Sequence, residues 1–297
     1  MATSRFPTSP EDQVRQASIA ISAASKDGKT NHSIRLLLPI IGATELDDWP
    51  GGARQMMEAA SPLIKDVLQL LQNTKDNESS ASTSSSFSVQ ESVIDQSDGV
   101  RALFSQANNP KDDACAVLLP SADTIPALQE LNEQVGSKRN FILVNSQWRR
   151  KSDFSGDMIM PFFGGGGGAS KDEKIQFVEN FEPTFHCSNV MVEGDIVRIL
   201  RTYPGPWRVY LRVVVEDDQM NIDWVEIGTK DVVPEKSSDW EANAREEGRE
   251  YDGGRLFDWG IPSYKDIEKM IVSREGYMPK SLSERAASAF TFIKDTL

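Results

Sequence analysis

Short apolar runs alternate with longer amphipathic segments through the first half of the chain. The runs at residues 33–41, 114–119 and 141–144 are apolar and partly β-branched, which is typical of buried strands. Helical patterns separate them, one after the sequence WPGG and another at residues 126–136. Because parallel neighbouring strands need a crossover of about a dozen residues, this spacing predicts βαβ units and a parallel sheet.

A further helix is predicted ahead of the first strand. Ser9 suits its N-cap, Pro10 its first helical position and Gly28 its end. Apolar residues recur between these positions at helical spacing, namely Val14, Ala17, Ile21 and Ala24. The helical pattern after WPGG contains Pro62, which predicts a kink or a restart there.

The second half of the chain favours antiparallel strands joined by close turns. In RTYPGPWRVYLRVVVE, residues 201–216, Pro204 and Gly205 predict a type II turn between two paired strands. Alternation along the returning strand predicts an aliphatic face with Val209, Leu211, Val213 and Val215, and a basic, aromatic face with Arg208, Tyr210 and Arg212. Helical segments follow at residues 264–275 and 282–296. We therefore predict an α/β fold with flanking helices, whose mixed sheet has a parallel βαβ N-terminal half and an antiparallel C-terminal half.

A single α/β domain is predicted over residues 6–297. The length and the 39% hydrophobic content suffice for a substantial core. Three biased stretches interrupt the pattern. A Ser-rich segment at residues 73–99 is predicted to be a flexible insertion, a Gly-rich loop spans residues 164–171, and an acidic segment spans residues 235–255.

The chain carries a formal net charge of −13 at pH 7. Nucleic-acid binding needs clustered basic residues, so we expect no nucleic-acid partner. The apolar runs are far shorter than the roughly 20 residues that cross a bilayer, so at most peripheral membrane contact is expected. Two cysteines are too few for a disulfide framework, which favours a reducing compartment.

Ligand motifs are weak. The glycine run lacks the Gly-Lys-Ser/Thr order of a phosphate-binding loop. His32, His186, Cys115 and Cys187 lack the paired spacing of zinc ligands. We therefore predict no catalytic residue, cofactor or metal.

Acidic side chains near Asp47, and the segment at residues 121–123, follow predicted strands. Open α/β sheets bind ligands at such strand ends. A small-molecule or nucleotide-binding enzyme is therefore an alternative function.

Arginines and aromatic residues gather around the predicted hairpin. These side chains are enriched at protein interfaces, since planar amphipathic groups bury a large area at low entropic cost. The predicted partner-binding residues are Arg198, Tyr203, Trp207, Arg208, Tyr210 and Arg212, together with Trp49 in the DWPGG loop.

Five segments stand out in order along the chain: FPTSPEDQVRQA, LPIIGATELDDWPGGARQM, VNSQW, FEPTFHC and ILRTYPGPWRVYLRV. Together they resemble the domain of unknown function found in the Low PSII Accumulation family of plants, algae and cyanobacteria, specifically its third member. The resemblance spans residues 6–235. The same domain is also found appended to some plastid adenylate kinases.

The resemblance implies a chloroplast protein of the stroma or the stromal face of the thylakoid, whose transit peptide is removed or absent from this chain. It further implies a non-enzymatic assembly or scaffold factor that binds photosystem core or assembly proteins. Such a factor serves photosystem II biogenesis through the synthesis or insertion of a chlorophyll-binding core subunit. The family brings no established active site, and a stable peripheral subunit of a photosystem complex is a second alternative.

Overall fold

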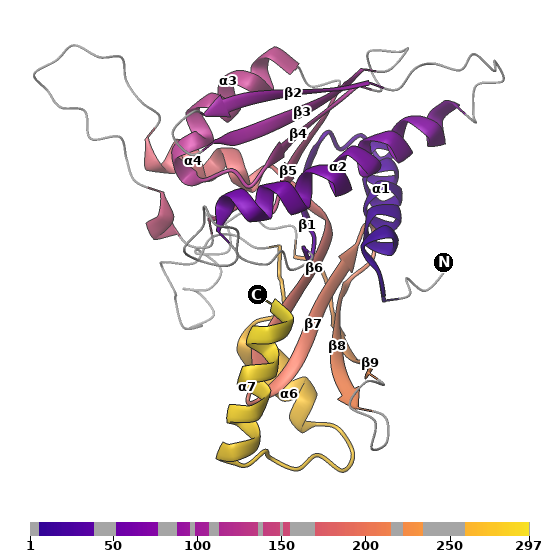
Figure 1. The fold of residues 1–297 in the computed structure, drawn as a ribbon, viewed down its shortest axis with the longest axis vertical. Coiled ribbons are helices and arrows are strands. Elements are labelled where there is room, and N and C mark those ends of the chain that lie inside the picture. The colour runs from indigo at the N-terminus through magenta and orange to yellow at the C-terminus, as the bar shows by residue number, and fades with distance from the viewer. Residues whose placement is uncertain are drawn as a thin grey trace, which may run out of the picture.

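A mixed sheet of nine strands forms the centre of the protein, in the order β2-β3-β4-β5-β1-β6-β7-β8-β9 (Figure 1). The computed structural model describes residues 6–38, 52–76, 88–95, 99–106, 113–135, 139–148, 151–154, 170–214, 222–233 and 259–296. The strands are β1 (Asn31–Arg35), β2 (Ser88–Asp95), β3 (Val100–Gln106), β4 (Ala114–Leu118), β5 (Asn140–Val144), β6 (Glu182–Val192), β7 (Asp195–Thr202), β8 (Trp207–Val214) and β9 (Ile222–Lys230).

The sheet changes character from its centre outward. β4, β5, β1 and β6 are parallel neighbours, whereas β2, β3 and β4 pair antiparallel. β6, β7, β8 and β9 also pair antiparallel and are called the ribbon below. The predicted α/β fold with a mixed sheet, flanking helices and an antiparallel C-terminal half is confirmed. The N-terminal half is parallel at β4, β5 and β1 as predicted, but it also contains the antiparallel strands β2 and β3, which were not predicted.

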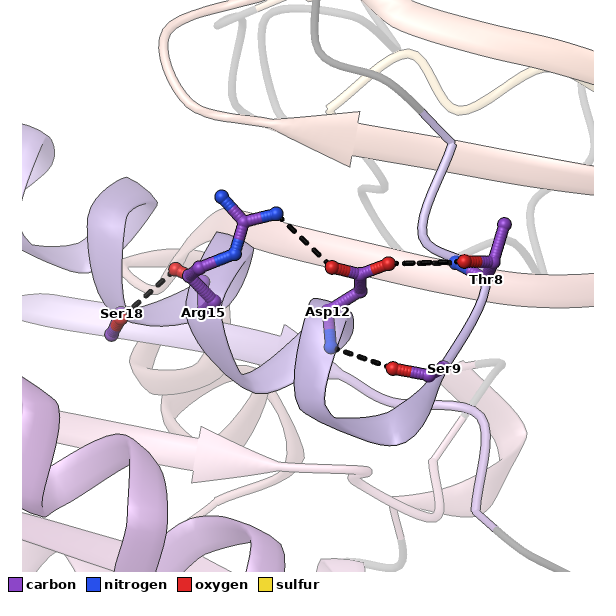
Figure 2. A network of polar contacts seen from close by, with 5 residues as sticks. All are labelled: Thr8, Ser9, Asp12, Arg15 and Ser18. Atoms are coloured by element: carbon purple, nitrogen blue, oxygen red, sulfur yellow. Dashed lines mark hydrogen bonds and ion pairs between the residues drawn. The ribbon is translucent and has the colours of Figure 1, made fainter.

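Two long helices cover the first face of the sheet. α1 (Pro10–Lys26) and α2 (Ala53–Asp76) pack on a core that includes Leu68, Ile142 and Phe185. As predicted, Ser9 caps α1, and its side chain accepts a hydrogen bond from the Asp12 backbone N–H (Figure 2). The first turn is then fixed by Asp12, which also accepts from the Thr8 hydroxyl at 3.1 Å and pairs with Arg15 at 3.0 Å (Figure 2).

The second face is covered in two separate places. α3 (Ile125–Val135) and α4 (Lys171–Glu179) pack over the parallel strands, around Phe141 and Leu143. α6 (Tyr264–Val272) and α7 (Leu282–Thr296) lie along the ribbon, towards the end remote from α3 (Figure 1). Ile267 and Ile271 of α6 pack there on Leu211. In the described chain, no helix combines the length and the apolar character needed to cross a membrane.

The first strand is shorter than the sequence predicts. β1 ends at Arg35, whereas the apolar run predicts a strand over residues 33–41. Leu36 and Leu37 leave the ladder because their backbone N–H groups donate to side chains, at 2.8 Å to Asn145 Oδ1 and at 2.9 Å to Gln13 Oε1. Residues 39–41 lie outside the described chain.

The predicted flexible insertion at residues 73–99 needs correction. α2 continues to Asp76, and because it runs through Pro62 as one helix, of the predicted kink or restart the restart is absent. β2 occupies Ser88–Asp95 and pairs with β3, which supplies backbone hydrogen bonds that a serine-rich composition does not reveal. Of the predicted Gly-rich loop, residues 164–169 lie outside the described chain, Ser170 is the N-cap of α4 and Lys171 is its first residue. The acidic segment at residues 235–255 also lies outside the described chain.

The hairpin is confirmed, but its turn is of another type. β7 and β8 pair antiparallel, with Arg198 opposite Tyr210. The turn spans residues 202–205, its Tyr203–Pro204 peptide bond is cis, and Gly205 N–H donates to Thr202 O at 2.8 Å. Proline therefore occupies the third position of a type VI turn, whereas a type II turn would have a trans proline at the second.

A pH-dependent stability follows from His32 in β1. The side chain is completely buried, with Nε2 3.1 Å from Asn140 Oδ1, and burial lowers its pKa from 6.5 to about 4. The unfolded chain binds this proton below pH 6.5 and the folded chain only below about pH 4. Between these values the free energy of unfolding should fall by about 3 kcal/mol as the pH is lowered.

Urea unfolding of the wild type and of His32→Gln across this pH range measures the effect. The variant should lose the part of the slope due to His32, while His186 remains in both proteins. Equal slopes in the two proteins would contradict this assignment.

A candidate binding cavity at the carboxyl ends of β1 and β5

A cavity of about 480 Å³ opens on the second face of the sheet, between the two regions covered by helices. It lies beyond the carboxyl ends of β1 and β5 and against the outer part of β6. The chain after β1 leads to α2 on the first face, and the chain after β5 leads to α4 on the second. This is the switch point at which α/β sheets bind ligands. Its aromatic lining includes Trp148, Phe181, Phe185, Trp207 and Trp259, and its polar lining includes Arg35, Ser146, His186 and Ser188.

Asn145 fixes the strand ends that border the cavity. It has a left-handed φ of 50°, which asparagine tolerates better than most residues. Its backbone N–H donates to Ile34 O at 2.9 Å. Its side-chain amide accepts from Leu36 N–H at 2.8 Å and donates to Leu36 O at 2.9 Å. The ends of β1 and β5 are therefore held together beyond the sheet ladder.

This arrangement orients Arg35, the last residue of β1. Its Nη2 donates to Ser146 O at 2.8 Å, just beyond the end of β5. Ser146 Oγ is itself buried and has no hydrogen-bond partner in the described chain. A guanidinium and a hydroxyl are thus brought to the same wall of the cavity.

His186 of β6 lies opposite Arg35 in the parallel register. Its Nε2 is 2.7 Å from Ser188 Oγ, and its ring meets that of Trp207 edge-on at 5.2 Å. Burial lowers the pKa of His186 well below its usual value, and the charges of Arg35 and Arg201 lower it further. His186 is therefore neutral near pH 7.

Trp259 also lines the cavity. Its carbonyl oxygen accepts from Trp207 Nε1 at 3.0 Å and from Val233 N–H at 3.1 Å. Both Trp259 and Gly260 have left-handed backbones, with φ of 56° and 78°. A Cβ atom on Gly260 would lie 2.8 Å from Val233 Cγ2 and 3.1 Å from its backbone nitrogen. Only glycine allows the chain here to approach Val233 so closely.

Gly260→Ala should therefore destabilise the protein by about 2 kcal/mol or more, through both the strained φ and the contact with Val233. Gly276 is the matched control, since it has φ of 75° but open space around its Cβ position. Gly276→Ala should cost only about 1 kcal/mol, from φ alone. Urea unfolding compares the two variants, and equal losses would show that the contact with Val233 is unimportant.

The lining has a defined charge. Arg35 is the only permanently charged side chain among the lining residues that the structure describes, and none of these residues is a carboxylate. The nearby Arg201 is buried and pairs with Glu182, Nη2 to Oε1, at 3.0 Å. Glu182 also pairs with Lys29 at 3.2 Å. Among the described lining residues the permanent charge is thus positive, although the chain as a whole is acidic.

The two histidines and two cysteines considered as zinc ligands form no metal-binding cluster in the described chain. Cys115 and Cys187 are buried free thiols, and burial raises the pKa of each to about 12. The part of the chain that the structure describes contains no cluster of three or more His, Cys, Asp or Glu side chains suited to a metal ion.

The predicted partner-binding residues are divided between the two faces of the ribbon. Trp207 is almost completely buried and contributes to the cavity. Tyr210 is also buried, but on the first face, 5.0 Å from the ring of Phe6. Burial raises the pKa of Tyr210 to about 12. Neither ring offers its surface to a protein partner.

The arginines of the first face remain partly exposed. Arg198 lies over the ring of Trp224 at 4.0 Å and over that of Phe6 at 5.1 Å. Arg208 pairs with Glu226 at 2.9 Å, and Arg212 stands opposite Trp224 in the β8–β9 register. The contacts of Arg198 help to hold the N-terminal segment to the ribbon, and the ion pair of Arg208 links β8 to β9.

Tyr203 lies beyond the end of β7, where its hydroxyl donates to Asp27 Oδ2 at 2.8 Å. Burial, followed by this bond to a carboxylate, raises the pKa of Tyr203 to about 12. It thereby ties the turn to the end of α1. Trp49 lies outside the described residues.

Sequence reasoning missed Arg35, Ser146, His186 and Ser188 as a group. A signal was present, because three of the segments that carry the family resemblance meet here. VNSQW supplies Ser146, FEPTFHC supplies His186, and the YPGPW turn supplies Trp207. The alternative site near Asp47 lies outside the described chain, and residues 122–124 form a short 3-10 helix after β4.

The fold and cavity define a mixed α/β protein with a pocket at a topological switch point. The family described as Domain of unknown function (DUF1995) matches residues 7–234. The chain belongs to this family. No curated protein and no solved structure matches it. The matched region contains the whole sheet. It does not contain Trp259, which lines the cavity, or the helices α6 and α7, which cover the ribbon.

Proposed function

We propose that this protein acts by binding and not by catalysis, and that the cavity is its ligand-binding site. The observation that carries the proposal is the position of an aromatic cavity at the switch point of the sheet. Small-molecule sites are usually pockets of roughly 300 to 1,000 Å³ with an apolar lining and a few convergent polar groups. The cavity lies within that range.

The Ser188–His186 pair is the feature nearest to catalytic machinery, and its surroundings favour binding. A serine nucleophile needs a histidine that accepts its proton, and that histidine is usually oriented and stabilised by an acid. Arg35 and Arg201 instead oppose protonation of His186. No carboxylate lines the cavity among its described residues.

A neutral fluorescent probe, N-phenyl-1-naphthylamine, tests the site. The wild type should bind it with increased emission, and Val190→Trp should weaken binding by about tenfold because the larger ring fills the cavity. Val190 lines the cavity on β6. Val93→Trp is the matched control, since Val93 is exposed on the edge strand β2.

Thermal unfolding gives a second readout. N-phenyl-1-naphthylamine at 100 times its dissociation constant should add about 2.7 kcal/mol to the free energy of unfolding of the wild type. Equal binding to the wild type and Val190→Trp would place the probe elsewhere and overturn the assignment of the cavity.

The cellular role proposed for this binding protein is assembly of photosystem II in the chloroplast. Support comes from the resemblance to the Low PSII Accumulation proteins, together with the family match over the same region. The partner would be a photosystem core or assembly protein. The partly exposed guanidiniums of Arg208 and Arg212 are proposed as its contact, on the face of the ribbon opposite the cavity.

The double variant Arg208→Glu/Arg212→Glu tests that contact. Arg208 pairs with Glu226 near the surface, so its loss should cost at most about 1 kcal/mol of stability. Immobilised wild type should capture a photosystem II core or assembly protein from thylakoid extract, and the variant should lose it. Arg15→Glu/Arg101→Glu, which changes two exposed arginines elsewhere, should retain it. Unchanged capture by the first variant would refute the contact.

A further inference from the structure

The charge of the lining limits the ligands that the cavity can accept. The chain as a whole is acidic, yet Arg35 is the only permanently charged residue that lines the cavity in the part of the chain described here. A charge in a site of low dielectric interacts more strongly with a ligand than the same charge in water. A lining of one sign therefore selects the sign of the ligand.

Polar groups converge on one wall. Arg35 ends β1, Ser146 follows β5, and His186 and Ser188 come from β6. The buried Ser146 hydroxyl has no hydrogen-bond partner in the described structure and stands beside the carbonyl to which Arg35 donates. Guanidinium and hydroxyl groups donate hydrogen bonds to the oxygens of carboxylates and sulfonates. This wall is therefore suited to an anionic group.

The remaining lining is suited to a planar apolar body. Trp207 and Trp259 are joined by a hydrogen bond, and Trp148 and Phe181 line the side nearest α4. Aromatic rings stack well on flat apolar groups.

We propose that the cavity binds a planar, apolar molecule that carries an anionic group, with Arg35 recognising that group. This assignment rests on the proposed function of the cavity as a binding site, and it adds the chemical class of the ligand.

Two probes with one ring system separate the anionic group from the apolar body. 8-Anilinonaphthalene-1-sulfonate carries one sulfonate, and N-phenyl-1-naphthylamine has the same rings without it. Arg35→Gln should weaken binding of the sulfonate probe by about tenfold or more. It should change the affinity for the neutral probe by less than about twofold. Arg35→Lys keeps the charge and should recover much of the lost affinity. Arg101→Gln, at an exposed ion pair on β3, is the matched control and should change neither.

Ser146→Asp tests the same point without removing Arg35, since it adds a carboxylate beside the guanidinium. This variant should likewise weaken binding of the sulfonate probe alone. It therefore tests the role of Arg35 even if Arg35→Gln does not fold. Equal weakening of both probes, or of neither, would overturn the role of Arg35 while leaving the cavity as a binding site. Failure of the wild type to bind the neutral probe would instead refute the proposed function itself.

Discussion

The length of β6 determines how the rest of the molecule is arranged. β1 ends at Arg35 opposite His186, and β6 continues to Val192 while pairing only with β7 in the described chain. The sheet therefore extends past the carboxyl ends of its parallel strands as an antiparallel ribbon. α3 and α4 cover the parallel part and α6 covers the ribbon, and the cavity lies at the step between them.

The two faces of the ribbon use their arginines differently. On the first face, Arg198 lies over the rings of Phe6 and Trp224, so its charge serves to fix the N-terminal segment. On the second face, Arg35 is anchored by a backbone carbonyl and faces an aromatic cavity without a carboxylate among the described lining residues. The difference explains why clustering of arginine and aromatic residues in the sequence did not by itself identify the cavity.

The elements governed by local physics could be predicted from the sequence. The Ser9 cap, the buried strand β5 and the pairing of β7 with β8 depend on capping, apolar runs and alternation near each residue. The early end of β1 depends on Asn145, more than a hundred positions away, and no periodicity reveals it. The cavity needs side chains from several strands and the distant Trp259, so only the folded chain assembles it.

Ligands are proposed to enter between the two covered regions of the second face. Indole N–H resonances in a two-dimensional ¹⁵N–¹H NMR spectrum report on this directly, because Trp148, Trp207 and Trp259 line the cavity while Trp224 lies on the opposite face. Addition of N-phenyl-1-naphthylamine should shift the first three resonances and leave that of Trp224 in place. A shift of Trp224 alone, or of none of these resonances, would contradict the account.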